Sequence, residues 1–423
     1  MGGGPVASIG PKRFRRQSLR TYPRGMGIMV VFSSFVALAM GPGLLNAYGV
    51  YEEEYDRLFD SKDESHAWSG ALGSPVIFIG VIQIFLANGM GFIGGHCAQR
   101  FGPGPSVFAG GILMALGLFA ASYAREIWQL CLSQGVLFGL GVCLTWIPAA
   151  SAPASWFEKN RGLATGITHM GLGIGGLVFA PLTRFLLEKT GTSGSLRWLA
   201  LVMFVGVAVA SLGIHSKHHE RPVSEIFVES VSMRFWLLSL GIGVGQASWY
   251  IILLFMTSIS VSVGLDVHNA AIVLGAINGA SAVGQFIAGY AADTIGPVNS
   301  LVVFTFVATV SNCILFVPNL SFRVLLAYAC VCGASIGAAD PLAVIAGVTQ
   351  FGRARAAKTT GLVYASVGGL VTVAAPVARV IQHKVGPAGF TSVYVFVIAL
   401  FSLSTVLLVL LRLRISRKLA FRV

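Results

Sequence analysis

Charged side chains are scarce in this sequence. Only 11% of its 423 residues are Asp, Glu, Lys or Arg, while 55% are hydrophobic. Soluble domains carry about 25% charged residues, so this chain has too little charge to cover a water-exposed surface. The composition excludes a soluble globular protein and a disordered chain, and it predicts an all-α protein that crosses a lipid bilayer many times.

The patterns of metal centres and catalytic sites are missing as well. The six cysteines lie within or at the end of apolar runs without the spacing of zinc ligands, which predicts free, mostly buried thiols. Nothing resembles a phosphate-binding loop, and no Ser/His/Asp or Cys/His set occurs within the apolar runs. We therefore expect no enzyme activity, no cofactor and no metal. The histidine-rich run at 215–219 is predicted to be a solvated linker, with a metal site as the alternative.

The net charge of +13 comes from 29 Lys and Arg against 16 Asp and Glu. These basic residues form short clusters between apolar runs, which favours orientation in a membrane over binding to nucleic acid. If the N-terminus is cytoplasmic, 20 of the 29 fall on the cytoplasmic side. The positive-inside rule then places both termini in the cytoplasm. The plasma membrane is the expected location, with the vacuolar membrane as the alternative.

Twelve apolar runs approach or exceed the ~20 residues that a spanning helix needs. They cover 26–50, 67–94, 104–123, 127–154, 162–187, 196–214, 235–262, 268–291, 298–318, 324–349, 358–382 and 388–411. The predicted organisation is a basic cytoplasmic tail (1–25), a six-helix bundle (26–214), a cytoplasmic linker (215–234), a second six-helix bundle (235–411) and a second basic cytoplasmic tail (412–423). The run Gly41-Pro42-Gly43 predicts an interruption of the first span, and the acids at 51–66 predict a polar segment after it.

Short motifs recur at a nearly constant offset of 193–195 residues. The pattern Gly95-x-x-x-Gln99-Arg100-x-Gly102 after the second span matches Gly289-x-x-x-Asp293-x-x-Gly296 after the eighth. Thr165-Gly166 matches Thr360-Gly361, and Ala180-Pro181 matches Ala375-Pro376. The repeat predicts two pseudo-symmetric parallel halves, with a transport site between them near the bilayer midplane. We interpret the first pair of motifs as gating motifs, whose glycines allow close helix packing and whose polar residues cap a helix end or bridge the halves.

The fifth span carries a family resemblance. Its segment Trp156-Phe157-Glu-Lys-Asn-Arg161-Gly162-Leu163-Ala164-Thr165-Gly166, continued by Gly171-Leu-Gly173-Ile-Gly175, resembles the fifth-helix signature of the monocarboxylate-porter branch of the major facilitator superfamily. Trp68-Ser-Gly and Gln134-Gly135 are also similar to that branch, particularly to its fungal members, and the resemblance covers essentially all twelve spans. It implies alternating access by rocking of the two halves, driven by a solute or proton gradient and not by ATP.

Several charges of that branch are absent. Carboxylate-carrying animal members have a Lys in helix one, where this chain has Asn46, and an Asp and an Arg in helix eight, where it has Asn278 and Ala282. Fungal relatives commonly have an Arg where this chain has Gln285. The Asp typical of the first cytoplasmic motif is replaced here by Gln99. These departures argue against proton-coupled transport of lactate or pyruvate.

Asp340 and His169 stand well inside predicted spans. A carboxylate such as Asp340 costs about 2.5–3.5 kcal/mol inside a membrane on insertion scales, so it should face the bundle interior. Asp340 is a protonatable coupling site or a partner for a cation, or else an acid that caps the helix break at Pro341. His169 is either a solute ligand that titrates near neutral pH or a hydrogen-bonded packing residue.

Uncharged donors, acceptors and rings occur in spans that would line the cavity. They are Asn46, Trp146, Gln246, Tyr250, Asn278, Gln285 and Tyr364. With His169, they predict a binding site for a mostly neutral, amphipathic or aromatic solute. The predicted function is secondary active or facilitative transport of a small organic solute by a monomer, with efflux of a fungal secondary metabolite favoured and protons as an expected coupling ion. The alternatives are uptake of a monocarboxylate or vitamin-like nutrient, or a non-transporting nutrient sensor on the same scaffold.

Overall fold

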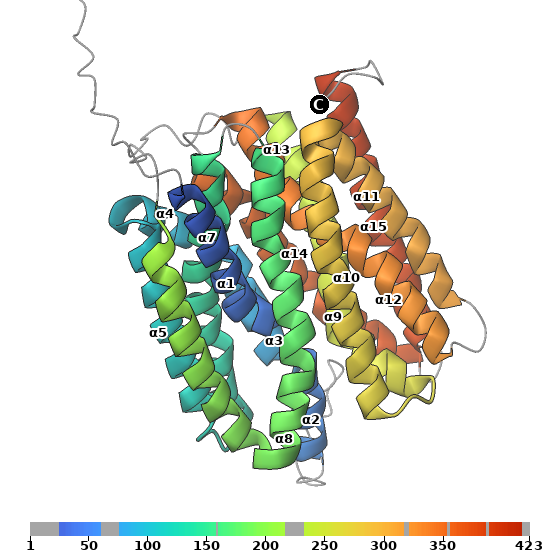
Figure 1. Ribbon diagram of the computed structural model, residues 1–423. Helices are drawn as coiled ribbons and strands as arrows, with labels where there is room; N and C mark the ends of the chain where they lie inside the picture. Colours follow the sequence, from blue (N-terminus) through green and yellow to red (C-terminus); the bar gives the residue numbers. More distant parts are fainter. Residues whose placement is uncertain are drawn as a thin grey trace, which may run out of the picture.

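The computed structural model is a helical bundle (Figure 1). It describes residues 25–60, 76–157, 160–215, 232–316, 321–352, 356–385 and 389–416, so most of the predicted tails and linker lies outside the described residues. The first half contains α1 (Met26–Asn46), α2 (Gly49–Asp60), α3 (Ile77–Ile84), η1 (Phe85–Gly89), α4 (Gly91–Phe101), α5 (Pro103–Ala121), α6 (Ile127–Leu130), η2 (Cys131–Leu137), α7 (Phe138–Trp156) and α8 (Arg161–Gly213). The second half contains α9 (Met233–Ser262), α10 (Val267–Thr294), α11 (Pro297–Ser311), η3 (Asn312–Phe316), α12 (Phe322–Gly337), α13 (Ala339–Phe351), α14 (Ala356–Val385) and α15 (Gly389–Ile415).

These helices make twelve crossings, as the sequence predicts. Ten segments are long and apolar enough to span a membrane alone, and the pair formed by Ile77–Gly89 and Gly91–Phe101, bent by 45°, is an eleventh crossing. The twelfth follows from α8, which turns back at Gly191 and therefore contains two crossings. The all-α polytopic fold class is confirmed.

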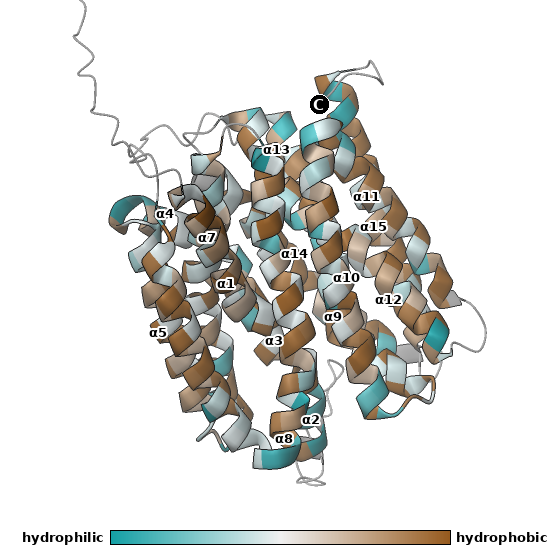
Figure 2. Ribbon diagram, viewed as in Figure 1, coloured by the Kyte–Doolittle hydropathy of each residue, from teal (hydrophilic) through white to brown (hydrophobic). Residues whose placement is uncertain are grey.

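The outer surface of the bundle is apolar along its length. Large hydrophobic side chains project outward, among them Leu212 (77% exposed), Val209 and Val373. Figure 2 shows brown, hydrophobic ribbon through the middle of the bundle and more teal, hydrophilic ribbon towards its two ends. A surface of this kind is suited to contact with lipid chains and would be unstable in water.

The two halves share a local backbone feature that accounts for one of the repeated motifs. Gly102 and Gly296 have φ of +94° and +96°, and each is followed by a proline that begins the next helix, α5 or α11. A positive φ favours glycine, and proline suits the first helical position because its missing N–H has no partner there. Both turns lie at the end of the bundle where α1 begins and α15 ends, which we call the terminal end (Figure 1).

The prediction that Gly41-Pro42-Gly43 interrupts the first span is wrong. Helix α1 continues through these residues to Asn46. A Cβ atom on Gly43 would lie 2.7 Å from the Cα atom of Gly175, so this glycine serves close packing between α1 and α8. Departures from regular α-helix occur elsewhere, among them Ala47, the π-helical segments η1 and η2, and Ala338 between α12 and α13.

The polar segment predicted for 51–66 is helical over its first ten residues, and its last six lie outside the described residues. Helix α2 turns two aromatic side chains inward. The hydroxyls of Tyr51 and Ser195 lie 2.9 Å apart, and the Tyr55 hydroxyl donates a hydrogen bond to Oε1 of Gln134 at 2.7 Å. These contacts fix α2 against the first half at the end opposite the terminal end (Figure 1). The acidic residues make the segment look uniformly polar in the sequence, although Tyr51 and Tyr55 form a buried face.

Candidate functional site

A buried carboxylate lies where three helices of the second half meet. Asp340 is in the first turn of α13, directly after the break at Ala338, and only 5% of it is exposed. Its Oδ1 atom accepts hydrogen bonds from the Tyr364 hydroxyl on α14, at 3.0 Å, and from Nε2 of Gln246 on α9. The side chain is therefore held by other spans. It makes no capping bond to its own helix in the described structure, which argues against the helix-break alternative.

Two contacts join this cluster to the first half. The rings of Trp146 on α7 and Tyr364 on α14 have centroids 5.2 Å apart. Tyr250, one turn after Gln246 on α9, accepts a hydrogen bond of 3.3 Å at its hydroxyl from Nδ2 of Asn88 in η1. We call the six residues Asn88, Trp146, Gln246, Tyr250, Asp340 and Tyr364 the central cluster. Its members come from both halves, at the interface where the sequence repeat places a transport site.

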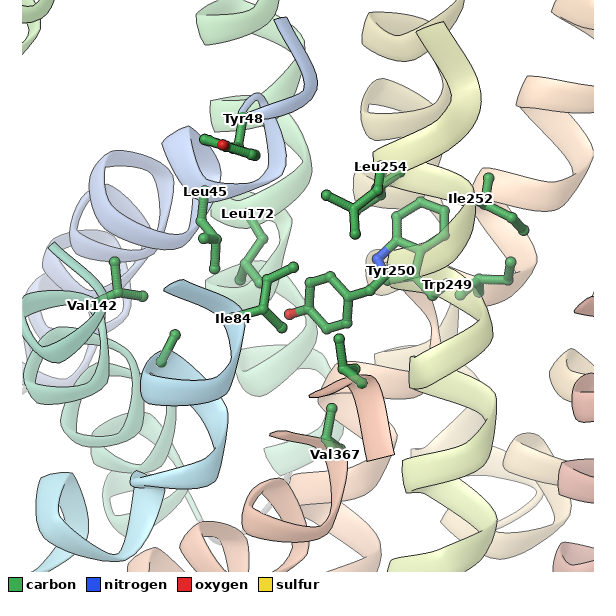
Figure 3. Packing of buried hydrophobic residues seen from close by; sticks show 14 of the residues in the cluster. Leu45, Tyr48, Ile84, Val142, Leu172, Trp249, Tyr250, Ile252, Leu254 and Val367 are labelled. Carbon is green, nitrogen blue, oxygen red and sulfur yellow. The ribbon is translucent and has the colours of Figure 1, made fainter. Parts of the chain in front are cut away.

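The surroundings of Tyr250 are apolar. Figure 3 shows its ring extending from α9 towards Ile84 of the first half, with Leu45 and Leu172 beyond and Val367 of α14 below. All of these side chains are buried. The central cluster therefore combines few polar groups with apolar and aromatic walls, the usual composition of a small-molecule site.

Three polar atoms of the central cluster lack a hydrogen-bond partner within the described part of the chain. They are the donor Nε1 of Trp146 and the acceptors Oε1 of Gln246 and Oδ1 of Asn88. All three residues are at most 3% exposed. Because a buried polar group without a partner is destabilising by about 1–3 kcal/mol, such atoms call for a specific explanation.

The structure places three other predicted ligands in a different location, the seam between α8 and α10. Asn278 donates to the carbonyl oxygen of Leu274 and packs against Gly176, where a Cβ atom would meet its Cγ at 2.6 Å. The backbone of Gln285 lies equally close to Gly166. Within the described residues, neither amide side chain makes a hydrogen bond to the Asp340 carboxylate, whose partners are Gln246 and Tyr364.

His169 lies on the same face of α8, since it is three residues after Gly166 and four before Gly173. It is fully buried, and its Nδ1 is 2.9 Å from the carbonyl oxygen of Thr165. The Thr165 contact fits the packing interpretation, whereas the Nε2 atom, which has no hydrogen-bond partner among the described residues, fits the solute-ligand interpretation. The seam brings α8 and α10 close through small residues, as Gly173 shows: a Cβ atom there would be 2.5 Å from the amide nitrogen of Ala282.

The remaining predicted ligand, Asn46, is buried at the last residue of α1, just before the chain bends into α2. Sequence analysis missed Asn88, whose amide contacts the central cluster. The available signal was an amide followed by glycine inside an otherwise apolar run, at 85–89. That signal is weak because many such amides only bond to their own helix, as Asn88 also does through the carbonyl oxygen of Ile84.

The gating motif of the second half bridges the two halves. The Asp293 carboxylate at the end of α10 accepts hydrogen bonds from the backbone N–H groups of Gly162 (3.0 Å) and Leu163 (2.9 Å) in the first turn of α8. Gly289 packs against Gly162, so the helices approach closely enough for this contact. An acid at a helix N-terminus satisfies free donors and complements the helix dipole.

The matching residues of the first half lie on α4. Gly95 is buried, Gln99 is half-buried, and Arg100 is exposed with its guanidinium 5.4 Å from the ring centre of Phe101. The motif residues before Gly102 and Gly296 are therefore helical, and only these two glycines form the turns. The position of Asp293 is taken by an uncharged amide in the first half.

Replacing Asp293 with Ala should destabilise the protein by about 0.5–2 kcal/mol, the typical effect of losing a helix N-cap. We expect a lower thermal unfolding midpoint for the purified protein in detergent. The control is Asp266→Ala, because Asp266 precedes α10 without a capping bond from its side chain. Equal midpoints for the two variants would show that the Asp293 bridge contributes no stability.

A sequence profile of the Major Facilitator Superfamily matches residues 25–230 and 238–421. Fujikurins efflux protein from Gibberella fujikuroi is 29% identical over 315 residues, covering 73% of this chain and 66% of that relative. An agnestins efflux protein from Paecilomyces divaricatus is 28% identical over 351 residues (81% and 78% of the two chains). Monocarboxylate transporter 13 from Rattus norvegicus is 29% identical over 370 residues (86% and 84%).

Proposed function

Because the chain belongs to the Major Facilitator Superfamily, we propose that it carries a small, mostly uncharged aromatic or amphipathic solute by alternating access, with Asp340 as its proton-coupling group. The family makes it a multi-pass membrane transporter and not an enzyme. The observation that carries the proposal is the buried carboxylate of Asp340, which is held by Tyr364 and Gln246 beside the junction of the two halves. Intramembrane acids of this kind are typical of proton-coupled carriers.

Alternating access is supported by contacts between the halves at both ends of the bundle. Near the terminal end, Gly91 of α4 packs against Gly361 of α14. At the opposite end, Gly49 of α2 lies against the carbonyl oxygen of Leu253 on α9. These small-residue contacts support a mechanism in which each end closes by helix packing while the other opens.

The charge of the central cluster supports a neutral solute. Asp340 is the one charged side chain among its six residues, and a carboxylate solute would be repelled there unless a cation compensated. Arg184 and Arg379, which stand three residues after Pro181 and Pro376, are engaged elsewhere. The Arg184 guanidinium is 3.1 Å from Glu188 and 3.8 Å from Glu53, and the Arg379 guanidinium donates to the side chain of Gln382 at 3.2 Å. Two of the similar proteins are named as efflux proteins for fungal products, and this supports export over uptake.

The test is flux in proteoliposomes that contain the full chain. We expect saturable flux of a neutral aromatic probe, such as 2-quinolone, to exceed that of lactate by about tenfold or more, because a buried charge needs a partner. Saturable lactate flux that is abolished by Asn46→Ala would contradict the proposal and favour the monocarboxylate alternative. Binding of the neutral probe without flux would favour a sensor.

A further inference from the structure

The unpartnered atoms of the central cluster carry information about the solute. We infer that the solute is a planar, uncharged molecule with at least one carbonyl acceptor, which binds Nε1 of Trp146, and at least one N–H or O–H donor, which binds Oε1 of Gln246 or Oδ1 of Asn88. This inference rests on the transport function proposed above and specifies the chemistry of the same site.

The orientation of each amide determines which of its atoms remains available. Nδ2 of Asn88 donates to the carbonyl oxygen of Ile84 at 3.0 Å and to the Tyr250 hydroxyl, so its oxygen is the free atom. Nε2 of Gln246 donates to the Asp340 carboxylate, and a reversed amide would put two acceptors together. Both amides therefore offer an acceptor, while the indole of Trp146 offers only a donor.

The three atoms belong to one connected group. Trp146 packs on Tyr364, Tyr364 and Gln246 share Oδ1 of Asp340, and Gln246 lies one helical turn from Tyr250, which binds Asn88. They come from α7, α9 and η1, and hence from both halves. A ligand that satisfies all three would join the halves at the level of the break before α13.

The aromatic and apolar side chains around the central cluster indicate the shape of the solute. Trp146, Tyr250 and Tyr364 present three rings, and Leu45, Leu172 and Val367 present apolar side chains around Tyr250 (Figure 3). Aromatic rings pack best against another flat π-system. A flat molecule with a few polar edge atoms would bury its faces on these walls and pair its edge with the three unpartnered atoms. A wholly apolar solute would leave them unsatisfied, and an anionic solute would lie beside the Asp340 carboxylate.

The test is equilibrium binding of radiolabelled 2-quinolone to the purified full chain. This bicyclic lactam carries N–H and C=O groups side by side, and N-methyl-2-quinolone lacks the donor. We expect the N-methyl compound to bind about tenfold more weakly to the wild type, since one lost hydrogen bond in a buried site has an effect of that size. This arm requires no variant and is independent of folding defects.

Variants then assign the partners. Trp146→Phe keeps a ring but removes the donor, and we expect it to weaken 2-quinolone binding about tenfold. Trp198→Phe is the matched control, because Trp198 is 54% exposed on the outer surface and should leave the affinity unchanged. In the double variant Asn88→Ala, Gln246→Leu, the two compounds should bind equally, because the acceptors for the lactam N–H are gone.

The inference is overturned if 2-quinolone does not bind at millimolar concentration, or if neither N-methylation nor Trp146→Phe changes its affinity, in which case water satisfies these atoms. Flux of the same probe in proteoliposomes separates this result from the proposed function. Binding with the expected pattern but without flux would overturn transport and leave the inference intact. Flux without the pattern would overturn only the inference.

Discussion

Asp340→Asn should abolish the response of solute flux to a pH gradient. The amide keeps the size of the carboxylate and a carbonyl oxygen that can accept from the Tyr364 hydroxyl and Nε2 of Gln246, but it does not exchange a proton in the relevant pH range. We expect an imposed gradient to change the initial rate for the wild type by about tenfold, the effect of roughly 1.4 kcal/mol of proton driving force. The same gradient should not change the rate for the variant.

The measurement is the initial flux of labelled 2-quinolone in proteoliposomes, with and without the gradient. Asp266→Asn is the control, since Asp266 is exposed at the start of α10. Solute exchange without a gradient should persist in the Asp340→Asn variant. This result would show that the variant is folded and has lost only its coupling to protons. If the gradient accelerates wild type and variant equally, Asp340 is not the coupling residue, and if it affects neither, the protein is a facilitator.

Gly368→Ala should shift the conformational equilibrium towards a state that is open at the terminal end. A Cβ atom on Gly368 would lie 2.5 Å from Cα of Gly89 across the interface of the halves, so α14 and η1 must separate. Overpacking of this kind typically destabilises the packed state by about 1–3 kcal/mol, which shifts a two-state equilibrium by roughly 5- to 150-fold. Gly369→Ala is the matched control, because nothing lies within 4 Å of its Cβ position.

The readout is labelling of a cysteine introduced at Thr360, which is 1% exposed in α14 near the terminal end. A membrane-impermeant maleimide should react about tenfold faster in the Gly368→Ala background and at an unchanged rate in the Gly369→Ala background. The same proteins without the introduced cysteine give the background from the natural thiols. Equal rates in both alanine backgrounds would show that the Gly89–Gly368 contact does not keep the terminal end closed.

The fold was largely predictable because its signals are long and periodic. Apolar runs of spanning length and the repeat of Gly102-Pro103 at Gly296-Pro297 each reflect a local requirement of the backbone. Breaks within spans were not predictable in the same way. Gly41 packs against α5 and α7 and Gly43 packs against α8, whereas the actual bend at Ala47 carries no special residue. A glycine that permits close approach and one that ends a helix look alike in sequence.

The candidate site was predictable only as a set of residue types. Burial of Asp340, Trp146, Tyr250 and Tyr364 in one contact group follows from how spans far apart in the chain pack together, and sequence spacing contains no such information. For the same reason Asn278 and Gln285 of α10 (span eight) were grouped with these residues, although their contacts lie at the seam between α8 and α10. The roles of all these residues remain predictions for the experiments above.

The turn at Gly191 has a consequence for how the protein enters the membrane. The 53 residues of α8 depart from helical geometry only at this glycine, whose φ of +70° reverses the chain within a single residue. Two spans joined so tightly have no linker that would allow one span to enter the bilayer while the other remains outside it. Insertion during synthesis must therefore take the fifth and sixth spans as one helical hairpin, and a marginally apolar stretch in either would be carried in by its partner.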